Sequence, residues 1–308
     1  MKADITEYLL SLKGSAKFGP QVVFQKESPP ISANYAENFP QLAQPLIDIL
    51  RRSGITKLYT HQQHAIDAIK QGHNVIVATP TASGKSMIYN LPVLDDLFSE
   101  KPGHSLYLFP LKALAQDQHS VLQKLFLQLP DDIQGTTPLH SALFDGDTSS
   151  YMRRKIRELQ PRVLLTNPEM LHLSLLPYHQ KWSEFFAKLR YVVIDEVHSY
   201  RGVLGSHMAW VLRRLQRIAS HYGANPTFIL LSATIGNPKQ LGQLLLDSPI
   251  EVLIESGAPQ PGKSMVFLNP WDSAAYTASQ LLEAAIKRGL RTIVYTQSRK
   301  MTELINIW

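Results

Sequence analysis

Residues 74–86, NVIVATPTASGKS, carry the strongest local pattern in the chain. The apolar and β-branched run at 74–78 predicts a buried strand, and helical spacing predicts a helix at 85–97. Gly-Lys-Ser between a strand and a helix indicates a P-loop, whose backbone N–H groups wrap nucleotide phosphates. The alternative is an ordinary helix cap, because Thr79 stands where the usual first glycine of the loop would be.

The alternation of strand and helix continues along the chain. Further apolar runs predict buried strands at residues 105–109, 142–144, 163–166, 191–195 and 227–231. Helices are predicted at residues 60–70, 112–129, 151–159, 206–221 and 237–246. This alternation predicts an α/β fold, a doubly wound parallel sheet covered on both faces. In such sheets, ligands bind beyond the carboxyl ends of the strands.

Changes in composition predict three parts. Prolines interrupt residues 1–55, which we expect to form an N-terminal arm, and residues 56–256 hold the complete α/β domain. Residues 257–262, GAPQPG, predict a linker. Beyond it, a strand at 265–268, a helix at 273–287, a strand at 292–295 and the start of another helix predict the beginning of a second domain. Residues 257–308 are therefore expected to be a linker and a truncated domain.

Composition narrows the function classes. Of the 308 residues, 44% are hydrophobic and 18% charged, which is typical of a soluble globular protein. The absence of cysteine excludes disulfides, a thiol nucleophile and a thiolate metal site. A net charge of +6 modestly favours a polyanionic partner such as nucleic acid. Without a signal peptide or a long apolar run, we expect a cytoplasmic protein with no membrane partner.

An acidic pair, Asp195 and Glu196, follows the predicted strand at 191–195. Asp195 could hold Mg²⁺, and Glu196 could orient or deprotonate an attacking water. Taken alone, the pair could also be a solvated strand end. In the P-loop, Lys85 would reach the β- and γ-phosphates, and the Ser86 hydroxyl would bind Mg²⁺. Together, the P-loop and the acidic pair predict hydrolysis of ATP or GTP.

Six blocks in order resemble the superfamily 2 helicases of DEAD/DEAH type. They are YTHQ at 59–62, TASGKS at 81–86, PLKALAQDQ at 110–118, TNPEML at 166–171, DEVH at 195–198 and SAT at 232–234. The longer stretches DEVHSYRGVLGSHM and SATIGNP are most similar to the MrfA-like bacterial DNA-repair helicases and their RecQ-four-like relatives. The resemblance covers about residues 40–300. It implies a RecA-like P-loop domain, followed by an incomplete second RecA-like domain.

The resemblance also implies ATP and Mg²⁺ as cofactors. Gln62 would read the adenine edge, while Ser86 and Asp195 would hold Mg²⁺. The catalytic residues would be Glu196 as base, with Asp195 and Lys85. The phosphates would be held by Thr81, Ala82, Ser83, Gly84, Lys85 and Ser86. His198, Ser232 and Thr234 would link the nucleotide state to the nucleic-acid groove, although a helix N-cap is the alternative for the SAT block.

Single-stranded or partly duplex nucleic acid is the expected partner, with DNA favoured. Residues that follow predicted strands share one rim of the sheet, where phosphates can be bound without reading sequence. They are Lys112, Asp145, Gly146, Thr148, Thr166 and Asn167. A further family-like block in the truncated domain adds Arg299. We interpret the basic residues at 153–155 and 213–214 as solvated helix faces, and His61, His64 and His73 as surface or capping residues rather than metal ligands.

The resemblance implies an ATP-driven helicase motor whose arginine finger lies in the second domain. Such an arginine contributes about 10³ to 10⁵ in rate, so we expect weak or no turnover from this chain alone. The alternative is a non-catalytic, truncated fragment that binds nucleotide and nucleic acid. A P-loop kinase or GTPase is disfavoured by the block at Gln62 and by the absence of an Asn-Lys-x-Asp motif.

Overall fold

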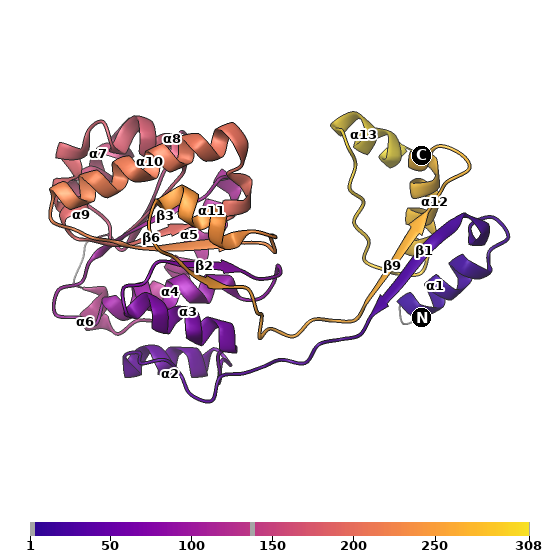
Figure 1. Ribbon diagram of the computed structural model, residues 1–308, viewed down its shortest axis with the longest axis horizontal. Coiled ribbons are helices and arrows are strands. Elements are labelled where there is room, and N and C mark those ends of the chain that lie inside the picture. The colour runs from indigo at the N-terminus through magenta and orange to yellow at the C-terminus, as the bar shows by residue number, and fades with distance from the viewer. Residues whose placement is uncertain (1–3, 136–138, 308) are drawn as a thin grey trace. The chain divides into compact units, whose positions relative to one another are not determined.

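The computed structural model describes residues 4–135 and 139–307 and divides into two compact units (Figure 1). The larger unit comprises Ser32–Pro259, and the smaller unit comprises Met1–Ile31 with Gln260–Trp308. The stretch at 1–55, expected to be one arm, is thus shared between both units. Its first part pairs with the C-terminal part of the chain, because β1 (Val22–Ser28) runs antiparallel to β9 (Lys263–Leu268).

The larger unit is built on a seven-stranded sheet of order β4-β5-β3-β6-β7-β2-β8. All of its neighbouring strands are parallel, which confirms the predicted fold class. The strands are β2 (Val75–Ala78), β3 (His104–Leu108), β4 (Ser141–Phe144), β5 (Val163–Thr166), β6 (Leu189–Ile194), β7 (Thr227–Ser232) and β8 (Glu251–Leu253). Only β8 was not predicted, because a three-residue strand at the sheet edge is too short to show a pattern.

Helices cover both faces of this sheet, and each face has its own apolar core. Val75 and Val77 of β2 point into one core, and Ile76 between them points into the other. In Figure 1, α3 and α4 lie on one side of the sheet and α10 on the other. The helices of this unit are α2 (Gln44–Arg52), α3 (Thr60–Lys70), α4 (Lys85–Asp96), α5 (Lys112–Phe126), α6 (Asp131–Gln134), α7 (Ser150–Leu159), α8 (Pro168–Met170), α9 (Ser183–Ala187), α10 (Gly202–His221) and α11 (Pro238–Leu246).

The described part of the smaller unit holds the two-stranded sheet β1–β9, a short 3-10 helix at Gly19–Gln21 and three α-helices. These are α1 (Ile5–Gly14), α12 (Ala274–Lys287) and α13 (Arg299–Ile307), and the Tyr8 hydroxyl of α1 donates to the Leu281 carbonyl at 3.0 Å. The strand predicted at 292–295 does not form, and Ile293 and Tyr295 are exposed. Among the described strands of this unit, β9 pairs with β1, and none pairs with residues 292–295.

No helix within residues 4–135 and 139–307 is both long and apolar enough to cross a membrane.

Candidate functional site

The strand order brings three predicted blocks to one edge of the sheet. β6, β7 and β2 are neighbours, and Ala78 of β2 pairs with Ser232 of β7. The P-loop follows β2, Asp195 follows β6, and Ser232 ends β7. Because the strands are parallel, their carboxyl ends share this edge, where a ligand of a doubly wound sheet binds.

The P-loop makes a tight turn into α4. Ala82 and Gly84 both have left-handed backbone conformations, with φ of 61° and 75°. Inside the loop, the buried hydroxyls of Thr79 and Ser83 lie 2.8 Å apart. The helix then begins at Lys85, so its unpaired N–H groups and the positive end of its dipole lie at the loop. This arrangement can hold an anion.

Lys85 turns back onto its own loop. Its Nζ donates to the carbonyl oxygens of Thr79 at 3.0 Å and Pro80 at 2.9 Å. Burial lowers the pKa of the Lys85 ammonium, while the negative charges of Asp195 and Glu196 act in the opposite direction. Lys85 therefore lies within the electrostatic field of the acidic pair, as the P-loop interpretation expects.

Side chains in the first turn of α3 contact the backbone of the P-loop. The Gln62 side chain donates from Nε2 to the Gly84 carbonyl at 2.9 Å, and its Oε1 accepts from the Tyr59 N–H at 2.9 Å. Both ends of the amide are thus used within the protein. Contact with an adenine edge, as expected of Gln62, requires that these hydrogen bonds be exchanged.

His61 is a buried part of this arrangement, only 2% exposed, and its interpretation as a surface residue is wrong. Its Nε2 lies 3.1 Å from the Ser83 carbonyl, and its Nδ1 accepts from the Gly257 N–H at 3.1 Å. Burial lowers the pKa of His61, which favours the neutral ring. His64 and His73 are exposed, and the described residues contain no group of three or more side chains placed to bind a metal.

The acidic pair lies in a strained turn after β6. Glu196 has a φ of 51°, and its N–H donates to Asp195 Oδ1 at 2.8 Å. Burial raises the pKa of Asp195 to about 6, and the negative charge of Glu196 adds to this rise. A carboxylate disfavoured in this way would be stabilised by a bound cation. The oxygen ligands available for Mg²⁺ here are the Asp195 carboxylate and the partly exposed Ser86 hydroxyl.

His198 lies between the acidic pair and the SAT block. Its Nδ1 is 3.1 Å from Glu196 Oε2 and 3.4 Å from the Ala233 amide nitrogen. Ser232 is fully buried, whereas Thr234 is exposed. The SAT block does not cap a helix, because α11 begins at Pro238 with Asn237 at its N-cap.

Two buried hydroxyls near this edge have no hydrogen-bond partner among the described residues, Ser232 Oγ and Tyr200 Oη. Burial raises the pKa of Tyr200, and the charge of Asp195 contributes. Sequence reasoning did not single out Tyr200. Its place two residues after His198 in the quoted stretch was the one available indication.

The residues predicted to bind nucleic acid differ in accessibility. Lys112 and Gly146 are exposed, and Lys112 Nζ lies 2.8 Å from Asp147 Oδ1. Thr166 is 2% exposed, and its hydroxyl donates to the Phe144 carbonyl. Asn167 caps α8 by accepting from the Met170 N–H at 2.8 Å. Thr166 is therefore a buried, structural residue at the carboxyl ends of the strands, whereas Lys112 is accessible to solvent.

The turn at 145–148 is held by its own polar groups. Asp145 is buried and accepts from the N–H groups of Asp147 at 2.9 Å and Thr148 at 3.1 Å. Arg153 donates to the carbonyl oxygens of Thr148 at 2.8 Å and Asp145 at 2.9 Å. The interpretation of Arg153 as a solvated residue is therefore wrong, since it fixes this turn. Arg154 is exposed on the helix face and pairs with Glu158.

Two further groups of predicted residues lie elsewhere. Arg213 lies over the Trp210 ring, with its guanidinium carbon 5.1 Å from the ring centre. Its Nε lies 3.6 Å from Asp247 Oδ2. Arg299 is the first residue of α13 in the smaller unit and is exposed.

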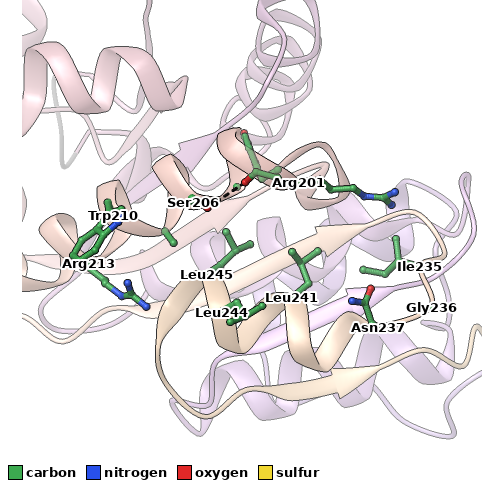
Figure 2. A pocket seen from close by; sticks show the side chains of 14 residues that line it. Arg201, Ser206, Trp210, Arg213, Ile235, Gly236, Asn237, Leu241, Leu244 and Leu245 are labelled. Carbon is green, nitrogen blue, oxygen red and sulfur yellow. Dashed lines mark hydrogen bonds between the residues drawn. The ribbon is translucent and has the colours of Figure 1, made fainter.

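A cavity of about 670 Å³ lies between α10 and α11. Leu241 and Leu245 of α11 face Ser206 and Trp210 of α10 across it (Figure 2). Tyr200 also lines it, but no residue of the P-loop or of the acidic pair does. The cavity is therefore separate from the predicted phosphate-binding loop.

A family model described as DEAD/DEAH box helicase matches residues 59–241, which include the P-loop, the acidic pair and the SAT block. The chain therefore belongs to the DEAD/DEAH box helicase family.

The chain is 41% identical over 313 residues to the uncharacterized ATP-dependent helicase YprA of Bacillus subtilis, covering 99% of this chain and 40% of the relative. It is 34% identical to the ATP-dependent helicase hrq1 of Schizosaccharomyces pombe, covering 97% of this chain and 29% of the relative. A crystal structure of the DUF1998 helicase MrfA bound to DNA matches with a TM-score of 0.90 and 40% identity, covering 99% of this chain and 43% of that chain. A second MrfA structure, with DNA and AMPPNP, matches with a TM-score of 0.89 and 41% identity, covering 98% of this chain and 42% of that chain. The chain thus spans less than half the length of these relatives, and its larger unit has the RecA-like fold that the sequence predicted.

Proposed function

We propose that this chain is the ATP-binding part of a helicase motor that acts on nucleic acid, with DNA favoured. The observation that carries the proposal is the meeting of the P-loop, Asp195 and Ser232 at one edge of the sheet, with Lys85 in the field of the acidic pair. The MrfA structures support it further, because one holds MrfA bound to DNA and the other holds it bound to DNA and AMPPNP.

Each residue has a proposed role. Lys85 exchanges the Thr79 and Pro80 carbonyls for phosphate oxygens, and the unpaired N–H groups of α4 bind the same phosphates. Ser86 and Asp195 hold Mg²⁺, which supplies charge neutralisation at the phosphates when bound. Glu196 accepts a proton from the attacking water. His198 passes the state of Glu196 to the SAT block, which it already approaches through Ala233.

For nucleic acid, we propose that the rim formed by Lys112, Gly146 and Asn167 contacts backbone phosphates. Lys112 supplies a charge, while Gly146 and Asn167 supply backbone N–H groups, since the N–H groups of Asp147 and Thr148 are already bound to Asp145. Such contacts carry no base information, which suits a motor that moves along a strand. Asp145 and Thr166 position this rim. Arg299, in the smaller unit, is proposed as a nucleic-acid contact of its own.

Steady-state ATP hydrolysis by the purified chain, with and without single-stranded DNA, tests the proposal beside Lys85→Ala. We expect Mg-ATP binding that requires Lys85, and turnover that stays weak unless an arginine finger takes part, because such a residue contributes about 10³ to 10⁵ in rate. DNA-stimulated turnover that is lost in Lys85→Ala would show a working motor. If the chain binds both Mg-ATP and DNA but shows no turnover with or without DNA, the alternative of a non-catalytic fragment that binds nucleotide and nucleic acid is correct instead.

A further inference from the structure

The two segments that connect the units of the chain meet beside the start of α3. Asn34 lies two residues after Ser32, and Gly257 lies two residues before Pro259, where the larger unit begins and ends. The Asn34 N–H donates to the Gly257 carbonyl at 2.8 Å, and the Thr60 N–H donates to the Asn34 carbonyl at 3.1 Å. The two connecting segments are therefore joined to each other and to α3.

Gly257 has no room for a side chain in this contact. A Cβ on it would lie 2.5 Å from the Asn34 carbonyl oxygen and 2.5 Å from the Thr60 hydroxyl oxygen. These distances are too short for carbon, so the close approach requires glycine. The Gly257 N–H is left facing His61, the next residue of α3.

His61 connects this junction to the P-loop. Its Nδ1 accepts from Gly257 and its Nε2 faces the Ser83 carbonyl, so a neutral ring with its proton on Nε2 satisfies both partners. Gln62, the next residue, holds the Gly84 carbonyl. The consecutive carbonyls of Ser83 and Gly84 are thus bound by the consecutive residues His61 and Gln62 of α3. His61 also binds a connecting segment, whereas the other end of Gln62 binds Tyr59.

We propose that His61 is a positioning residue that couples the P-loop to the segments connecting the two units. The proposal rests on nucleotide binding at the P-loop. In this proposal, the peptide planes at Ser83 and Gly84 shift when the N–H groups of the loop wrap phosphates. The imidazole is rigid and buried, so a shift of the Ser83 carbonyl at Nε2 changes the hydrogen bond that Nδ1 makes with Gly257. Nucleotide occupancy thereby alters how firmly the connecting segments are held.

Amide hydrogen exchange of the full chain, measured with and without Mg-AMPPNP, tests this coupling. In the wild type, we expect nucleotide to protect the P-loop and to change exchange in peptides that contain Gly257 by about three- to tenfold, the effect of one hydrogen bond. In His61→Ala, the P-loop protection remains, but the change at Gly257 is lost. His61→Gln keeps one donor and one acceptor and restores part of the response. His64→Ala, a change at an exposed residue of the same helix, behaves as the wild type.

Several outcomes would overturn the proposal. One is a wild-type chain that binds Mg-AMPPNP without any change at Gly257. Another is a full response at Gly257 in His61→Ala, or in His61→Phe if the alanine variant does not fold, since phenylalanine keeps a buried ring without polar atoms. If the wild-type P-loop shows no protection at saturating Mg-AMPPNP, the proposed nucleotide binding fails, and the coupling fails with it.

Discussion

The side-chain nitrogen of Gln62 donates to the Gly84 carbonyl at 2.9 Å, and a Cβ on Gly84 would lie 2.6 Å from that same nitrogen. The helix that precedes the P-loop in sequence and the loop itself are therefore in such close contact that position 84 cannot carry a side chain unless Gln62 moves.

Gly84→Ala should weaken Mg-AMPPNP binding at least tenfold, because it adds a left-handed strain of about 1–2 kcal/mol and displaces Gln62 from the loop. Gly72→Ala is the matched control, since Gly72 has a φ of 83° but nothing within 4 Å of an added Cβ. Calorimetric titration measures binding, and thermal unfolding measures the strain that both variants share. Equal losses of affinity in the two variants would refute a specific effect of the Gln62 contact.

Asp195→Asn should stabilise the nucleotide-free chain at pH 7 by about 1–3 kcal/mol. The pKa of Asp195 is raised from 3.8 to about 6, so the folded state disfavours the carboxylate. This penalty is fully present above pH 6, declines as the pH falls, and vanishes below 3.8. Chemical denaturation at pH 7 measures the gain, and Asp117→Asn, at an exposed residue, serves as the control. A less stable Asp195→Asn variant would contradict the argument.

His104 should make the fold sensitive to acid. It is buried, and its Nδ1 donates to the Pro161 carbonyl at 2.9 Å. Burial lowers its pKa from 6.5 to about 4, with nearby Arg162 and Lys188 adding to the effect. The unfolded chain takes up the proton first, so stability is complete above pH 6.5 and falls as the pH drops toward 4.

Between pH 7.5 and pH 5, His104→Asn should lose about 2 kcal/mol less free energy of unfolding than the wild type. Denaturation curves at the two pH values measure the difference. His64→Asn, which changes an exposed histidine, should follow the wild type. Parallel pH profiles for wild type and His104→Asn would show that His104 does not titrate in this range.

Arg153→Ala should loosen the turn at 145–148 and weaken single-stranded DNA binding about tenfold, because Arg153 binds the carbonyls of Thr148 and Asp145. Charge-assisted bonds of this kind contribute about 1.5–3 kcal/mol each when buried, and partial exposure of Arg153 to solvent reduces that contribution. Lys155→Ala removes the same charge from an exposed position nearby. Fluorescence anisotropy with labelled DNA at fixed salt compares the two. Equal losses would assign the effect to net charge alone.

The larger unit could be predicted from sequence because its signals are local. A buried parallel strand reads as a continuous apolar run, and β2, β5 and β7 each do so. β1 was missed because most of it is exposed, and the strand expected at 292–295 has no pairing neighbour within residues 4–135 and 139–307. An apolar run shows that a strand can form, but it does not show that a partner is in place.

The residues of the candidate site also fall into those that the sequence could predict and those that it could not. Lys85 and Asp195 could be predicted because their positions at strand ends are visible in the sequence itself. The contacts of His61 could not, since its partner Gly257 is 196 residues away along the chain. Arg153 was misread because a basic residue on a helix is usually solvated, and only the folded turn supplies the carbonyls that bind it.

The resting position of Lys85 has a consequence for selectivity. Since its ammonium already has two carbonyl acceptors, an anion gains only the difference between its own bonds and those that it displaces. A phosphate oxygen carries a negative charge and a carbonyl oxygen does not, so Coulomb attraction to the ammonium adds to the hydrogen bond and a polyphosphate gains from the exchange. Chloride and other monovalent anions, which offer one weakly held charge, gain little. We therefore expect the loop to bind a polyphosphate in preference to monovalent anions.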